Sequence, residues 1–140
     1  MLTATLPSYV KDSRLERQDR REWGSEVTRL MSVALAEDAV RARRKTVTRR
    51  LGWHMLKSGD HLTLCRKVMG RRKDEPLVRI CEVEVVDGRR ERLSAITDAD
   101  VEREGFDLDE WVASDFVEFF CEHMKCKPET EVTRIEWRYL

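Results

Sequence analysis

A chain of 140 residues, of which 41% are hydrophobic, is long enough to bury the core of a single domain. Its 27 basic and 27 acidic residues cancel, and this neutral total excludes a simple polycationic arm. No apolar run approaches the roughly 20 residues of a membrane-spanning helix, and the charged segment 11–22 predicts no signal peptide. We therefore expect a cytoplasmic protein that does not enter a membrane.

The charges are unevenly distributed along the chain. Residues 41–73 contain twelve Lys or Arg side chains and one acid, whereas residues 97–122 contain ten acids and one base. This polarity allows one face to attract an anion while another repels it or forms internal ion pairs.

The chain begins with a segment that differs from the rest. Residues 1–24 are predicted to be a charged extension, either disordered or a solvated helix, because their apolar periodicity is weak. One domain is predicted over residues 27–140. Within it, residues 30–35 form a predicted buried strand, and residues 36–40 begin a short helix with acids near its N-terminus.

The middle of the chain predicts antiparallel strands. Alternating apolar residues indicate strands over 62–68 and 77–85, joined by the basic loop 70–75. Asp87-Gly88 is typical of a tight turn because glycine accepts a positive φ. Residues 89–93 are therefore expected to pair back on the preceding strand.

Two helices follow. Thr97 is a predicted N-cap for a short helix that ends at Gly105. The next helix is predicted from an apolar stripe at helical spacing, formed by Val112, Phe116, Phe119, Phe120 and His123. Most of this stripe is expected to be core.

The last element is a strand over residues 132–139, with Ile135 facing one way and Arg134 the other. The order of elements predicts an α+β fold, a small mixed β-barrel with flanking helices. The side chains expected on its inner face are Leu62, Leu64, Val83, Val85, Ile135 and Trp137.

A basic surface for nucleic acid is predicted from residues 41–50, with a second cluster at 66–73 on the same face. The residues expected to contact nucleic acid are Arg43, Arg44, Lys45, Arg49, Arg50, Trp53, Arg71 and Arg72. Trp53 offers a plane for an unstacked base, or alternatively packs in the core. Arg71 and Arg72 contact phosphate, or alternatively form a solvated loop tip.

No metal or other cofactor is predicted. The four cysteines include no CxxC pair, which leaves a zinc site poorly supported. Cys121, His123 and Cys126 form the one cluster with metal-binding residue types, and reduced thiols at a helix end are the simpler interpretation.

Residues 43–50, Arg-Arg-Lys-Thr-Val-Thr-Arg-Arg, resemble the ASCH signature G-x-K-x-x-E-x-R in the form where Thr replaces the Glu. The likeness continues through the Lys57-Ser58-Gly59-Asp60 turn and the helix end at 102–106 to the closing strand, and covers about residues 27–140. It departs from the signature at Arg43, where the family has Gly. The chain thus resembles ASCH-domain proteins of phages and bacteria.

The resemblance implies a PUA-like barrel that binds RNA or a modified nucleoside in a basic cleft. One ASCH branch consists of amidohydrolases that remove the acyl group from N4-acetylcytidine. Its active-site Lys, Thr and Glu match Lys45, Thr48 and Glu104 in this sequence. The resemblance thus implies these three as catalytic residues and extends the cleft to Arg50.

The chemistry of Lys45, Thr48 and Glu104 allows each a catalytic role, and a structural interpretation stands beside it. Lys45, among several arginines, has a like-charge reason to lose its proton and act as a base, if it is also partly desolvated. Thr48 could supply the hydroxyl or position water, and Glu104 could protonate the leaving nitrogen. In the alternative, Lys45 is one solvated charge and Thr48 a strand residue. A third hypothesis is a protein-interaction or regulatory module whose charge polarity docks a protein partner. The sequence does not predict the oligomeric state.

Overall fold

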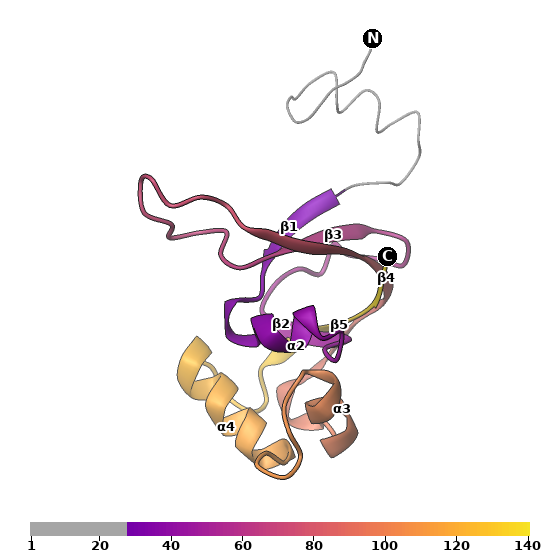
Figure 1. Ribbon diagram of the computed structural model, residues 1–140. Helices are drawn as coiled ribbons and strands as arrows, with labels where there is room; N and C mark the ends of the chain where they lie inside the picture. Colours follow the sequence, from indigo (N-terminus) through magenta and orange to yellow (C-terminus); the bar gives the residue numbers. More distant parts are fainter. Residues whose placement is uncertain (1–27) are drawn as a thin grey trace.

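The computed structural model describes residues 28–140, in which five strands form one sheet with helices gathered at one end (Figure 1). The strands are β1 (Thr28–Ser32), β2 (Val47–Arg50), β3 (His61–Cys65), β4 (Arg79–Arg92) and β5 (Glu131–Tyr139). The helices are α2 (Glu37–Arg41), α3 (Asp98–Arg103) and α4 (Ala113–Met124), with short 3-10 turns η1 (Ala34–Ala36) and η2 (Leu93–Ala95). The predicted extension 1–24 lies outside the described residues.

The sheet has the order β1-β3-β4-β5-β2, so β1 and β2 are its edges. β1 pairs in parallel with β3, and the other pairs are antiparallel. The prediction of an α+β fold with a mixed sheet is confirmed, but the prediction of a closed barrel is wrong. Instead of a strand ladder, the Arg50 guanidinium on β2 donates a hydrogen bond across the gap to the Ser32 carbonyl on β1.

The tight turn predicted at Asp87-Gly88 is also wrong, because β4 runs through it for 14 residues. A register shift between Val85 and Asp87 bends the strand, and the residues after it pair with β5. Gly88 is needed here for close packing. A Cβ at this position would lie 3.1 Å from the Leu56 carbonyl oxygen, so the glycine reflects an approach of two backbone segments and not a turn.

The core divides into two apolar clusters. One lies on the inner face of the sheet, and the six side chains predicted there are all buried, which confirms that prediction: Leu62, Leu64, Val83, Val85, Ile135 and Trp137. The second cluster joins α3 and α4 to the sheet through Val101, Phe116 and Val132. These two helices are thereby fixed against the end of β5.

The helix predictions after residue 96 are confirmed. The Thr97 side chain accepts a hydrogen bond from the backbone N–H of Asp100 and caps α3. Gly105 follows α3 at φ 106°, where a Cβ would lie 2.7 Å from the Cβ of Ala39. The strand predicted over 30–35 ends earlier, at Ser32, because the chain turns into η1. Within residues 28–140, no helix is both long and apolar enough to cross a bilayer.

Candidate functional site

A cavity of about 310 Å³ lies where β2, the connection from β1 to α2, the end of α3 and α4 meet. Its polar lining consists of Ser32, Lys45, Thr48, Arg49, Arg50, Glu104 and His123. Its aromatic wall consists of Phe106, Phe116, Phe119 and Phe120. The three residues matched to an active site, Lys45, Thr48 and Glu104, therefore line one cavity, although they lie up to 59 positions apart in the sequence.

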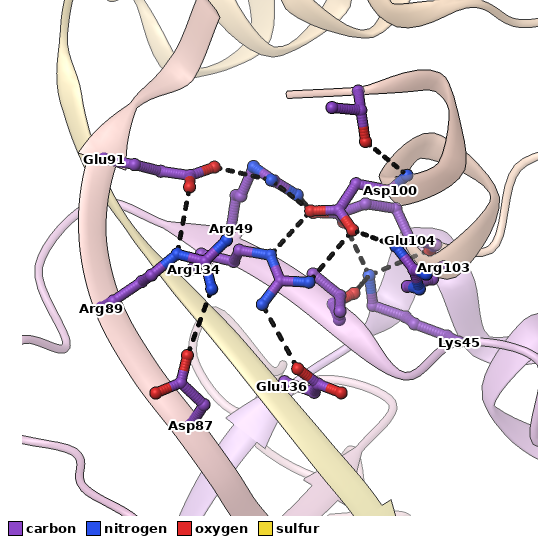
Figure 2. Close-up of polar contacts among 12 residues, drawn as sticks. Lys45, Arg49, Asp87, Arg89, Glu91, Asp100, Arg103, Glu104, Arg134 and Glu136 are labelled. Atoms are coloured by element: carbon purple, nitrogen blue, oxygen red, sulfur yellow. Dashed lines mark hydrogen bonds and ion pairs between the residues drawn. The ribbon is translucent and has the colours of Figure 1, made fainter. Parts of the chain in front are cut away.

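The ammonium group of Lys45 is buried and fully hydrogen-bonded. Its Nζ donates to the Glu104 carboxylate at 2.9 Å, to the Glu104 carbonyl at 3.0 Å and to the Val47 carbonyl at 2.9 Å (Figure 2). Burial lowers the pKa of Lys45 from its ordinary value, and the charge of Glu104 opposes that effect. A proton on Lys45 is thus held less tightly than on an exposed lysine.

The backbone of Lys45 is held by β5. Its carbonyl accepts hydrogen bonds from Trp137 Nε1 at 3.0 Å and from the Tyr139 hydroxyl. The next residue, Thr46, receives the Trp137 N–H on its carbonyl and donates its own N–H to the Arg103 carbonyl. The segment before β2 is therefore fixed between β5 and the end of α3, beside Glu104, to which the Lys45 side chain donates.

Arg43, the position at which the signature has glycine, adopts a backbone conformation that favours glycine. Its φ is 61°, in the left-handed region that costs a residue with a side chain roughly 1–2 kcal/mol. The guanidinium lies over the Tyr139 ring, 5.4 Å from its centroid, which partly offsets this cost. The backbone at position 43 therefore favours glycine.

This geometry predicts different outcomes for two substitutions at position 43. Arg43→Gly and Arg43→Ala both lose the contact with Tyr139, but alanine keeps the strained φ. We expect the glycine variant to exceed the alanine variant in free energy of unfolding by about 0.5–1 kcal/mol, measured by urea denaturation. An alanine variant as stable as the glycine variant would contradict strain at this turn.

Glu104 belongs to a buried network of charges that extends well beyond Lys45. Its second carboxylate oxygen accepts a hydrogen bond from Arg49 Nη1 at 3.1 Å. The other nitrogen of that guanidinium, Nη2, contacts carboxylates of both Asp100 and Glu91 (Figure 2). Arg49 thus connects the cavity to the part of the network around Asp100 and Glu91. Its side chain is only 1% exposed.

Asp100 is the central carboxylate of this other part of the charge network. Its carboxylate accepts from Arg49, from Arg134 through both Nε and Nη2, and from Arg103 Nη1 at 2.8 Å. The hydrogen bonds from Arg134 and Arg49 hold the pKa of Asp100 well below its ordinary value, although burial opposes them. The carboxylate is therefore ionised across the physiological pH range.

Thr48 and Arg50 form the side of the cavity near β1. The Thr48 hydroxyl accepts a hydrogen bond from Arg50 Nε at 3.1 Å, and Arg50 Nη2 donates to the Ser32 carbonyl at 2.6 Å. Thr48 is 3% exposed, so its hydroxyl is accessible mainly from the cavity. The cavity thus combines a buried amine, a hydroxyl, a carboxylate and a guanidinium.

The residues predicted to contact nucleic acid lie in different surroundings. Arg43 and Arg44 are exposed near the end of α2, whereas Arg49 is buried in the charge network. Trp53 is partly buried against the sheet core, which agrees with its alternative interpretation.

Arg71 and Arg72 are exposed in the loop between β3 and β4. In Figure 1 this loop extends from the end of the sheet opposite α3 and α4, well apart from the cavity wall. Arg71 also donates to the carbonyls of Val68 and Glu75, so it helps to shape its own loop.

Several residues of the site are not predicted from the sequence. They are Asp100, Arg134 and Glu91, and the phenylalanines of α4 are predicted only as core. One signal is present in the sequence, since Asp100 in α3 and Glu104, the residue that follows α3, are four positions apart, the spacing of neighbours on one helix face. Among residues 28–140, no three His, Cys, Asp or Glu side chains form a group able to hold a metal ion.

No family model matches the chain, and no curated protein matches its sequence. Solved structures share its fold, among them the following two. An ASCH domain from Lactobacillus crispatus JV V101 superposes with a TM-score of 0.58 at 13% identity, covering 89% of this chain and 90% of that one. A DUF984 protein from Enterococcus faecalis V583 superposes with a TM-score of 0.57 at 12% identity, covering 90% and 85%. The chain therefore has the fold of an ASCH domain.

Proposed function

We propose that this domain binds a single nucleobase, as a modified nucleoside or as one residue of an RNA strand, in the cavity between β2 and α4. The observation that carries the proposal is the combination of an aromatic wall with a convergent set of polar groups in a space of about 310 Å³. Small-molecule sites have this character, with volumes of about 300–1,000 Å³ and few polar groups that fix orientation.

The aromatic wall supports a planar ligand. Phe119 is partly exposed, stacks on His123 with ring centroids 5.5 Å apart, and meets Phe106 edge-on at 6.2 Å. All three side chains line the cavity. Unstacked bases in protein–RNA complexes lie on such aromatic side chains.

The polar groups support recognition of a base edge. Glu104 offers carboxylate oxygens, the Thr48 hydroxyl donates or accepts, and Arg50 donates. A pyrimidine edge presents both donors and acceptors, so this mixed set suits it better than a purely apolar ligand. The exposed Arg71 and Arg72 belong to the proposal as phosphate contacts for a longer RNA outside the cavity.

The test is a calorimetric titration with cytidine, N4-acetylcytidine and a short single-stranded RNA. Phe119→Ala should weaken binding of all three by about tenfold or more, because a base stacked on an aromatic ring gains about 1–3 kcal/mol. Met69→Ala is a matched control, since Met69 is 84% exposed in the loop between β3 and β4. Equal affinities of the two variants for these ligands would refute a base in this cavity.

A second candidate function is hydrolysis of N4-acylated cytidine, favoured by the 2.9 Å contact of Lys45 with Glu104 in a cavity that also holds Thr48. The reaction adds water across the bond between N4 and the acyl carbon, and it releases a carboxylic acid and cytidine. Lys45, whose pKa burial lowers, first passes a proton to the Glu104 carboxylate that it contacts, and the neutral amine then accepts a proton from the attacking water, which Thr48 positions. Protonated Glu104 gives its proton to the departing nitrogen, so both residues return to their starting states. If the Thr48 hydroxyl attacks instead, it forms an acyl ester, and a water activated in the same way hydrolyses that ester.

A further inference from the structure

Arg50 differs from the other two cations of the cavity in what it contacts. Lys45 and Arg49 each form ion pairs with Glu104. Arg50 donates instead to two neutral acceptors, the Thr48 hydroxyl and the Ser32 carbonyl. Among residues 28–140, no carboxylate forms an ion pair with its guanidinium.

A charged side chain that is buried without an ion-pair partner raises the free energy of the folded protein. Burial lowers the pKa of Arg50 from its ordinary value, an effect that the charge of Glu104 only partly opposes. Arginine nonetheless stays charged in proteins, and buried charges are as a rule paired. The two hydrogen bonds also leave N–H donors of the guanidinium unused, because a guanidinium has more donors than these acceptors occupy.

We propose that Arg50 is the anchor for a phosphate group of the ligand, so that the cavity takes nucleoside phosphates in preference to neutral nucleosides. The proposal rests on the function proposed above and specifies its ligand class. The planar fork of a guanidinium matches the oxygens of a phosphate, and the resulting hydrogen bonds are about twice as strong as neutral ones. A phosphate at Arg50 lies on the β1 side of the cavity, and the base then lies toward Phe119 on α4.

The experiment compares ligands that differ only in the phosphate. The full chain is titrated at constant ionic strength with cytidine, cytidine 5′-monophosphate, cytidine 3′-monophosphate and inorganic phosphate. We expect one of the two monophosphates to bind at least about tenfold more tightly than cytidine, because hydrogen bonds to charged groups exceed neutral ones. The preference should shrink as salt is added.

Single substitutions test whether the preference for a monophosphate over cytidine depends on Arg50. Arg50→Gln should remove the preference for the monophosphate over cytidine, whatever its effect on cytidine itself, whereas Arg50→Lys should keep part of the preference. Arg92→Gln removes the same charge from an exposed side chain at the end of β4, outside the cavity lining, and should leave the preference intact. Equal binding of cytidine and both monophosphates by the unaltered protein would overturn the proposal. So would an equal loss of preference in Arg50→Gln and Arg92→Gln.

The outcomes separate this inference from the proposed function. If cytidine binds and depends on Phe119 but a phosphate adds nothing, the anion site is wrong and the base-binding cavity stands. If inorganic phosphate binds in an Arg50-dependent manner and the nucleoside adds nothing, the anion site stands and the base-binding cavity is wrong.

Discussion

Replacing Asp100 with asparagine should lower the free energy of unfolding by about 3–5 kcal/mol, the usual cost of breaking a buried ion network by removing one partner. The carboxylate accepts hydrogen bonds from Arg49, Arg103 and Arg134. Asparagine removes the charge that compensates these cations. It also turns one acceptor into an N–H₂ donor that faces their N–H groups.

The measurement is urea denaturation of the variant beside Glu102→Gln. Glu102 lies on the same helix, is exposed and also loses one negative charge, so this control should change stability by no more than about 0.5 kcal/mol. An Asp100→Asn protein within about 1 kcal/mol of the unaltered one would show that the network contributes little. Failure of the variant to fold would agree with the expected loss.

The same variant should alter how stability depends on pH. The folded-state pKa of Asp100 lies below that of an unfolded aspartate, which is about 3.9. Its contribution is therefore complete above that value and declines as the pH falls toward the lower folded-state pKa. Between about pH 5 and pH 2, the unaltered protein should lose stability more steeply than Asp100→Asn.

Replacing Glu104 with glutamine should lower the rate of N4-acetylcytidine hydrolysis by about a hundredfold or more, if the second candidate function is correct. Glutamine has the size of glutamate but cannot carry a proton to the leaving nitrogen. Substrate should still bind, because the aromatic wall is unchanged. A domain that binds RNA through its phosphates alone should bind as well or slightly better, because a negative charge has left a site that faces phosphate.

The matched control for this substitution is Glu91→Gln. Glu91 is also a carboxylate partner of Arg49, at 2.7 Å, but it does not line the cavity. Both variants thus remove a negative charge beside Arg49, and only one of them alters the cavity. An equal fall in hydrolysis rate in both would assign Glu104 a structural role. Absence of hydrolysis by the unaltered protein, tested also with longer N4-acyl cytidines, would remove the enzyme hypothesis for these substrates.

The contact between Lys45 and Glu104 could be anticipated from resemblance but not from residue patterns. The two residues are 59 positions apart, and neither strand alternation nor helical spacing relates them. Their approach depends on Thr46 donating to the Arg103 carbonyl and on Gly105 packing against Ala39. Such long-range backbone contacts leave no local signal in a single sequence.

Arg134 shows where alternation along a strand misleads. The sequence places Arg134 on the polar face of β5, and the structure keeps it on that face. Asp100 on α3 covers it there, so the arginine is only 5% exposed. Alternation identifies the two faces of a strand but cannot tell which part of the polar face another element will cover.

The open edge of the sheet has a consequence for how a ligand enters and leaves. In a closed barrel, widening a site between two strands would break several ladder hydrogen bonds at once. Here β1 and β2 are linked across the gap by a side-chain hydrogen bond from Arg50 to the Ser32 carbonyl, and a hydrogen bond from a charged group contributes about 1.5–3 kcal/mol. If the proposed ligand enters between β1 and β2, rotation of the Arg50 side chain breaks this one link, and the ladder hydrogen bonds of the sheet stay intact.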